Sequence, residues 1–166
     1  GKEAARPLSG TAAGRVALGR GAGGDHTLEI DRACEQAMTG VLAREAPASY
    51  LLISEEVGIA GPKDAPWRVV VDPLDGSLNA RRGLEPFCAS VAVARGPTLG
   101  DVEIGYIEDY TRCRCFAAVK GAGSVSSATI PGAPPGGPDG VVSATIPSVS
   151  LIETGRFASG LVEIVL

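Results

Sequence analysis

Apolar residues follow a helical period in one early segment of the chain. From Thr27 to about Glu45 they fall on one broad face, at Leu28, Ile30, Cys34, Ala37, Met38, Val41 and Leu42. This spacing predicts an amphipathic helix, which Pro47 ends. We also expect residues 2–8 to form the end of a helix that stops near Pro7.

Short apolar runs predict the strands. One run, Leu51–Ser54, ends on Glu55, and another, Val69–Val71, ends on Asp72. Pro73 removes a backbone donor and is expected to stop the second strand. Turn residues separate three further strands, at 87–94, 102–108 and 113–119, which predicts an antiparallel meander. The fold class is therefore α+β, an antiparallel sheet layered with helices.

Gly and Pro mark the predicted loops. Residues 9–25 are rich in Gly and read as a mobile loop or loose hairpin, and residues 57–66 read as a loop. We divide the chain into an α+β domain at 1–125, a Gly/Pro-rich linker at 126–140 and the start of a truncated second domain at 141–166. The last part is too short for a core of its own.

Composition narrows the class of protein. The 15 basic and 19 acidic residues give a net charge of −4, and no Lys/Arg cluster suggests a nucleic-acid surface. No apolar stretch approaches the roughly 18 residues of a membrane span, and no signal pattern opens the chain. The four cysteines lack Cys-x-x-Cys spacing, so we expect structural thiols. Cytoplasmic localisation is the default.

Acidic residues follow both early strands. If these strands are neighbours, Glu55 joins Asp72 and Asp75 in one cluster. Crowded carboxylates are costly unless cations neutralise them. Oxygen ligands without His or Cys favour Mg²⁺, with Mn²⁺ also possible, over Zn²⁺. His26, alone in a loop, is expected to be a bystander.

The turn after the second run adds an anion site to this prediction. Gly76 permits a tight turn, and Ser77 is expected to cap a short helix over residues 77–82. The free N–H groups at such a helix N-terminus favour an anion. Asp31 lies near the first turn of the long helix, where a carboxylate also favours the helix dipole.

Three segments carry a resemblance to a known family. Their sequences are Gly-Ala-Gly-Gly-Asp-His-Thr-Leu-Glu-Ile-Asp at 21–31, Ile-Ser-Glu-Glu-Val-Gly at 53–58 and Val-Asp-Pro-Leu-Asp-Gly-Ser-Leu-Asn-Ala at 71–80. Together, in this order, they resemble the inositol monophosphatase superfamily of Mg²⁺-dependent phosphatases. The chain is most similar to the prokaryotic branch that hydrolyses inositol monophosphates and fructose 1,6-bisphosphate. The resemblance covers residues 10–125.

The resemblance implies a role for each motif residue. Glu55, Asp72, Asp75 and the carbonyl of Leu74 would be metal ligands. Asp31 and the Ser77 hydroxyl would be catalytic, positioning and helping to deprotonate the attacking water, while Asp75, Gly76 and Ser77 would hold the substrate phosphate. Glu56 would lie behind the ligands, or else be solvated. The full-length protein would be a homodimer acting on a small phosphorylated polyol or sugar by two-metal activation of water.

The sequence departs from the family pattern in two ways. The family usually has Thr where this chain has Ser77. It also carries a further metal-binding Asp in a Trp-Asp motif, whereas the one Trp here, Trp67, precedes Arg68. We therefore expect the chain as given to be a poor catalyst. The alternatives are a non-catalytic metal-binding remnant or assembly module and, among enzymes, a 3′(2′),5′-bisphosphate nucleotidase.

Overall fold

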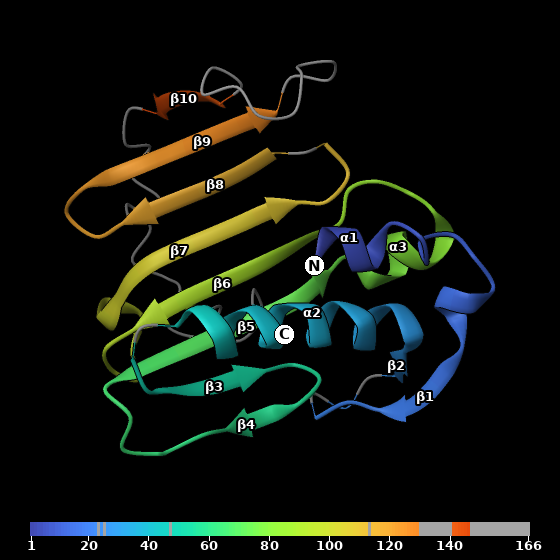
Figure 1. Ribbon diagram of the computed structural model, residues 1–166, viewed down its shortest axis with the longest axis horizontal. Coiled ribbons are helices and arrows are strands. Elements are labelled where there is room, and N and C mark those ends of the chain that lie inside the picture. The colour runs from blue at the N-terminus through green and yellow to red at the C-terminus, as the bar shows by residue number, and fades with distance from the viewer. Residues whose placement is uncertain (23, 25, 47, 113, 130–140, 147–166) are drawn as a thin grey trace.

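The protein is an α+β fold in which helices cover one region of a long sheet (Figure 1). The computed structural model describes residues 1–22, 24, 26–46, 48–112, 114–129 and 141–146. The helices are α1 (Lys2–Ala5), α2 (Glu29–Glu45) and α3 (Ser77–Arg82), with single 3₁₀ turns at Ala13–Arg15 and Leu99–Asp101. The strands are β1 (Ala17–Arg20), β2 (His26–Leu28), β3 (Tyr50–Ser54), β4 (Gly58–Ala60), β5 (Trp67–Asp75), β6 (Cys88–Ala94), β7 (Val102–Asp109), β8 (Arg114–Val119), β9 (Gly123–Thr129) and β10 (Val141–Ile146).

Eight of the described strands form one sheet in the order β10-β9-β8-β7-β6-β5-β3-β4. Neighbours are antiparallel except β3 and β5, which run parallel, with Ser54 opposite Val71. The predicted adjacency of the two acidic strands is thus confirmed. Since carboxyl ends of parallel neighbours lie at the same edge, the residues that follow Ser54 and Val71 are brought together.

The long helix α2 packs on β5 and crosses the sheet over β3 and β5 (Figure 1). Its Met38 and Leu42 contact a core cluster of Leu52, Val69 and Val71. Ile30 and Cys34 lie in a second cluster, which also holds Ala5, Leu28, Leu74, Ala80, Phe87, Ala89 and Tyr110. Val41 departs from the predicted apolar face, since it is 47% exposed.

The prediction that Pro73 stops the second strand is wrong. β5 continues to Asp75, and its pairing with β6 shifts between Asp72 and Asp75. Asp72 lies opposite Ser90 and Asp75 opposite Cys88, so β5 has one more residue here than β6. Such a bulge accommodates a proline because the extra residue needs no ladder hydrogen bond.

Other boundaries also differ from those predicted. Residues 27 and 28 belong to strand β2 and not to the helix. The Gly-rich segment contains β1, which pairs with β2 as a hairpin, one of the two alternatives expected there. The segment predicted as a loop at 57–66 contains β4. Helix α3 has its predicted bounds, but its N-cap is Gly76 and not Ser77.

The predicted domain boundary at residue 125 falls inside β9, so the first residues of the predicted linker are strand. β10 pairs with β9 and extends the same sheet. Most of the predicted linker and second domain, residues 130–140 and 147–166, lies outside the described residues, as does Cys113. None of the described helices is long and apolar enough to cross a membrane.

Candidate functional site

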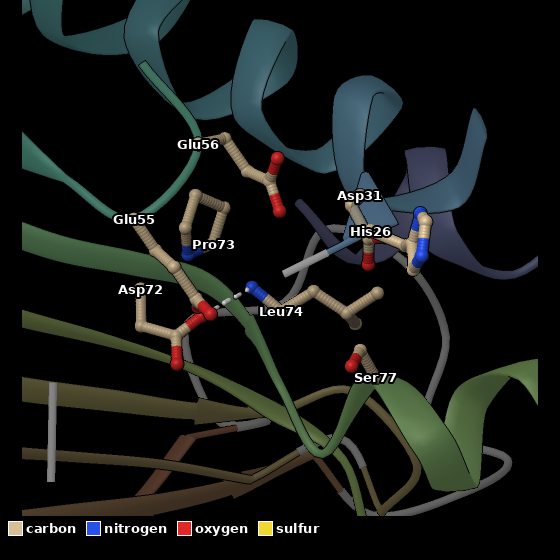
Figure 2. Close-up of a pocket in the computed structure, with 8 residues that line it drawn as sticks. All are labelled: His26, Asp31, Glu55, Glu56, Asp72, Pro73, Leu74 and Ser77. Carbon is tan, nitrogen blue, oxygen red and sulfur yellow. Dashed lines mark hydrogen bonds between the residues drawn. The ribbon is translucent and has the colours of Figure 1, made fainter. Parts of the chain in front are cut away.

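The carboxyl ends of β3 and β5 meet the N-terminal part of α2 at a small cavity. Its volume is about 30 Å³, which is room for roughly one or two water-sized species. The residues that line it are His26, Asp31, Glu55, Glu56, Asp72, Pro73, Leu74 and Ser77. Figure 2 shows Glu55 and Asp72 on one side, His26, Asp31 and Ser77 on the other, and Glu56 reaching in from the turn after β3.

Asp31 belongs to the first turn of α2 and is only 5% exposed. Its Oδ2 accepts a hydrogen bond from the Leu28 N–H at 2.8 Å, which satisfies a backbone donor at the start of the helix. Burial raises the pKa of Asp31 to about 6, the Leu28 bond opposes this rise, and the charge of Glu56 adds to it. The side chain therefore caps the helix and faces the cavity at once.

Asp72 is the second buried carboxylate, 4% exposed. Its Oδ1 accepts a hydrogen bond from the Leu74 N–H at 3.0 Å, drawn as a dashed line in Figure 2. Burial raises the pKa of Asp72 to about 6, and the charges of Asp75, Asp31 and Glu56 add to the rise. Like charges therefore crowd this cavity, and a bound cation would relieve their repulsion.

A hydrogen bond from Tyr110 stabilises the bulge that carries Leu74. The buried Tyr110 hydroxyl donates a hydrogen bond to the Pro73 carbonyl at 3.0 Å. Gly76 then turns the chain at φ 86° into α3, which begins at Ser77. Leu74 and Ser77 both reach the cavity from this turn.

Glu56 is tied to the β1–β2 hairpin. Its carboxylate accepts a hydrogen bond from the Thr27 hydroxyl, and its carbonyl accepts one from the Ala22 N–H at 3.2 Å. Gly21 lies so close that a Cβ there would come within 2.7 Å of Glu56 Oε2. The Gly-rich segment therefore packs directly against the acidic cavity.

Six of the predicted site residues line the cavity, namely Asp31, Glu55, Glu56, Asp72, Leu74 and Ser77. Asp75 and Gly76 do not. Asp75 is exposed at the end of β5, and the Cys88 thiol donates to its Oδ2 at 3.7 Å. The roles predicted for these residues, ligand, catalytic or phosphate-binding, stay predictions.

Two residues at or near the cavity were not among the predicted site residues. His26 lines the cavity, and its expected role as a bystander stays a prediction. Glu35 is buried on α2, four residues after Asp31, and accepts a hydrogen bond from the Ser54 hydroxyl. The spacing of Glu35 from Asp31 places both on one helix face, but it does not show that this face is buried at Glu35.

The chemistry of the cavity fits a hard cation. Its side-chain donors, apart from His26, are carboxylate and hydroxyl oxygens, which Mg²⁺ prefers. Within the described part of the chain, however, no three His, Cys, Asp or Glu side chains stand together as a ready ligand set. The carboxylates must draw closer for three of them to share one ion.

Comparison with known proteins identifies relatives. The sequence profile of the inositol monophosphatase family matches residues 5–158. A curated relative from Pasteurella multocida, "Nus factor SuhB", is 36% identical over 100 residues, which cover 60% of this chain and 36% of the relative. The "Fructose-1,6-bisphosphatase/inositol-1-monophosphatase" of Methanothermobacter thermautotrophicus is 35% identical over 133 residues, covering 74% of this chain and 47% of that protein.

A solved structure also resembles this chain. A hypothetical protein from Pyrococcus horikoshii "with similarities for Inositol-1 monophosphatase" superposes with a TM-score of 0.59 at 26% identity. The match covers 73% of this chain and 44% of that structure. The chain spans less than half the length of each of these relatives.

Proposed function

This chain belongs to the inositol monophosphatase family, and from that premise we propose that it is the metal-binding part of a Mg²⁺-dependent phosphomonoesterase. The substrate class is a small phosphorylated polyol or sugar, inositol monophosphate or fructose 1,6-bisphosphate. One observation carries the proposal. Carboxylates from three separate segments, at Asp31, at Glu55 with Glu56, and at Asp72, line one small cavity.

Phosphate monoesters resist hydrolysis because their negative charge repels nucleophiles and the alkoxide leaves poorly. Divalent cations supply the missing positive charge and polarise the phosphoryl group. Glu55, Asp72 and the Leu74 carbonyl would hold such a cation from within the cavity. Asp75 lies opposite Cys88 in the sheet and accepts a hydrogen bond from its thiol. The Asp75 carboxylate would join the other ligands once it turns away from Cys88.

Asp31 and Ser77 would orient the attacking water. The Leu28 N–H fixes the carboxylate of Asp31, and a pKa of about 6 leaves this group largely ionised at pH 7. A base with a pKa near the working pH both accepts and releases a proton readily. The first N–H groups of α3, at Gly76 and Ser77, would bind phosphate oxygens, as the family resemblance implies.

A hydrolysis assay tests this proposal. The chain and its Asp72→Asn variant are incubated with Mg²⁺ and inositol 1-phosphate, fructose 1,6-bisphosphate or adenosine 3′,5′-bisphosphate. We expect slow, Mg²⁺-dependent phosphate release from the first or second substrate, because the Trp-Asp ligand is missing from this sequence. Release should fall by about 10²-fold or more in Asp72→Asn, since one misplaced group can cost that much.

Asp64→Asn is the matched control, because Asp64 is an exposed aspartate outside the cavity. It should leave the rate unchanged. Equal rates for the parent chain and Asp72→Asn would contradict the proposal. Preference for the adenosine bisphosphate would instead favour a bisphosphate nucleotidase.

The second candidate is a non-catalytic metal-binding or assembly module. Two observations favour it: the described carboxylates do not form a ready set of three ligands, and several curated relatives bear the name "Nus factor SuhB". Saturable Mg²⁺ binding without hydrolysis of any of the three substrates would support this candidate over the enzyme.

A further inference from the structure

Glu35 is a buried carboxyl group outside the set of residues that line the cavity. It is 4% exposed on the inner face of α2. Its Oε2 accepts a hydrogen bond from the Ser54 hydroxyl at 2.6 Å, while its Oε1 has no hydrogen-bond partner among the described residues. Burying a carboxyl with one unpaired oxygen costs free energy, and an apolar side chain would avoid this cost.

The Glu35–Ser54 contact joins two elements that supply the cavity. Ser54 is the last residue of β3 and directly precedes Glu55 and Glu56. Glu35 lies one helical turn after Asp31 on α2. A bond between them therefore fixes the end of β3 to the helix that carries Asp31.

The acidic segment after β3 needs such a restraint. Asp31, Glu55, Glu56 and Asp72 all line one cavity of about 30 Å³, so their like charges repel one another. On one side, Thr27 and Ala22 hold Glu56 to the hairpin. On the other side, Glu35 holds Ser54.

We propose that Glu35 is a positioning residue that acts through Ser54 to keep Glu55 and Glu56 at the cavity, where they can contribute to binding a divalent cation. The inference rests on the proposed function of the cavity as a cation site. Groups behind metal ligands orient them, and their loss typically weakens metal affinity about 10- to 100-fold.

The test uses the 166-residue chain and three variants. Ser54→Ala removes the donor with little change of volume, Glu35→Ala removes the acceptor, and Glu35→Gln keeps an acceptor oxygen for Ser54. Gln36→Ala, at the exposed neighbouring position on α2, is the matched control. Amide hydrogen exchange is measured by mass spectrometry, and Mn²⁺ affinity by calorimetry.

Without Mn²⁺, we expect faster exchange at residues 53–57 in Ser54→Ala and Glu35→Ala, with β7 unchanged. Mn²⁺ affinity should fall by about tenfold or more in both variants. Glu35→Gln and Gln36→Ala should match the parent chain in both measurements. Rescue by Gln separates positioning through Ser54 from a role of the negative charge itself.

Unchanged exchange at residues 53–57 in both Ser54→Ala and Glu35→Ala would overturn the inference. Faster exchange with undiminished Mn²⁺ affinity would overturn it too, because the contact would then be structural only. A parent chain that binds no Mn²⁺, yet shows the local dependence on Glu35, would contradict the proposed function and leave the contact itself established.

Discussion

The Asp31 carboxylate caps a helix and lines an acidic cavity, and this double placement has a consequence for stability. Its pKa of about 6 exceeds the usual value of 3.8 because the group is buried beside Glu56. A carboxyl whose pKa is raised on folding favours the folded state while it is protonated. That contribution is complete below about pH 4 and is lost as the pH rises through 6.

We therefore predict that Asp31→Asn in EDTA leaves stability nearly unchanged at pH 4 and increases the free energy of unfolding by about 3 kcal/mol at pH 7. Asparagine keeps an oxygen for the Leu28 N–H but carries no charge. Urea unfolding across this pH range measures the difference between variant and parent. Glu45→Gln, at an exposed position of the same helix, is the control. A difference that does not grow with pH would refute the buried-carboxylate account.

Sequence reasoning found Asp31, Glu55 and Asp72 because each stands at the end or start of a predicted element within a recognisable motif. It missed Glu35, since a Glu in an amphipathic helix ordinarily faces solvent. The direction of the Glu35 side chain is seen only from its contact with Ser54, where α2 packs near the end of β3. The contact depends on tertiary structure, which periodicity along the chain does not encode.

At the scale of elements, the boundaries of the helices were predicted better than those of the strands. Residues 77–82 form α3 as expected, and α2 begins only two residues late. Strand β5 runs through Pro73 because a bulge absorbs the lost donor, and β9 forms from a Gly/Ser-rich segment because it pairs with β8. Pairing of this kind depends on neighbours distant in the chain and overrides local propensity.

The turn between β5 and α3 provides a test of backbone geometry. Gly76 has φ 86°, and a Cβ there would approach the Pro86 carbonyl to 3.1 Å and Phe87 Cβ to 3.2 Å. We expect Gly76→Ala to destabilise the fold by roughly 1–2 kcal/mol, the usual cost of a left-handed conformation for a residue with a Cβ. It should also displace Ser77 at the cavity.

Gly40→Ala makes the same chemical change in the middle of α2. Among the described residues, the added methyl group would meet only the Arg44 guanidinium, at 3.6 Å, and helix propensity should raise stability by about 0.5–1 kcal/mol. Thermal unfolding of the two variants distinguishes the positions. Equal effects would mean that the turn does not constrain residue 76.

At the scale of the whole molecule, one feature of topology creates the site. β3 and β5 are the parallel pair in a sheet whose other described neighbours are antiparallel, so two carboxyl ends stand side by side beneath the start of α2. Glu55 and Glu56 directly follow β3, and Asp72 and Asp75 lie in the last part of β5. The chain spans less than half the length of its relatives, yet this arrangement lies within the described residues.

The most direct test of the account is calorimetric titration of Mg²⁺ into the metal-free chain, its Asp72→Asn variant and the Asp64→Asn control. If the cavity is a cation site, the parent and the control should bind Mg²⁺ alike, and Asp72→Asn should bind at least about tenfold more weakly. Circular dichroism checks that the variants are folded. Superimposable binding isotherms for the parent and Asp72→Asn would contradict the account, because a buried carboxylate that lines the cavity would then contribute nothing to binding.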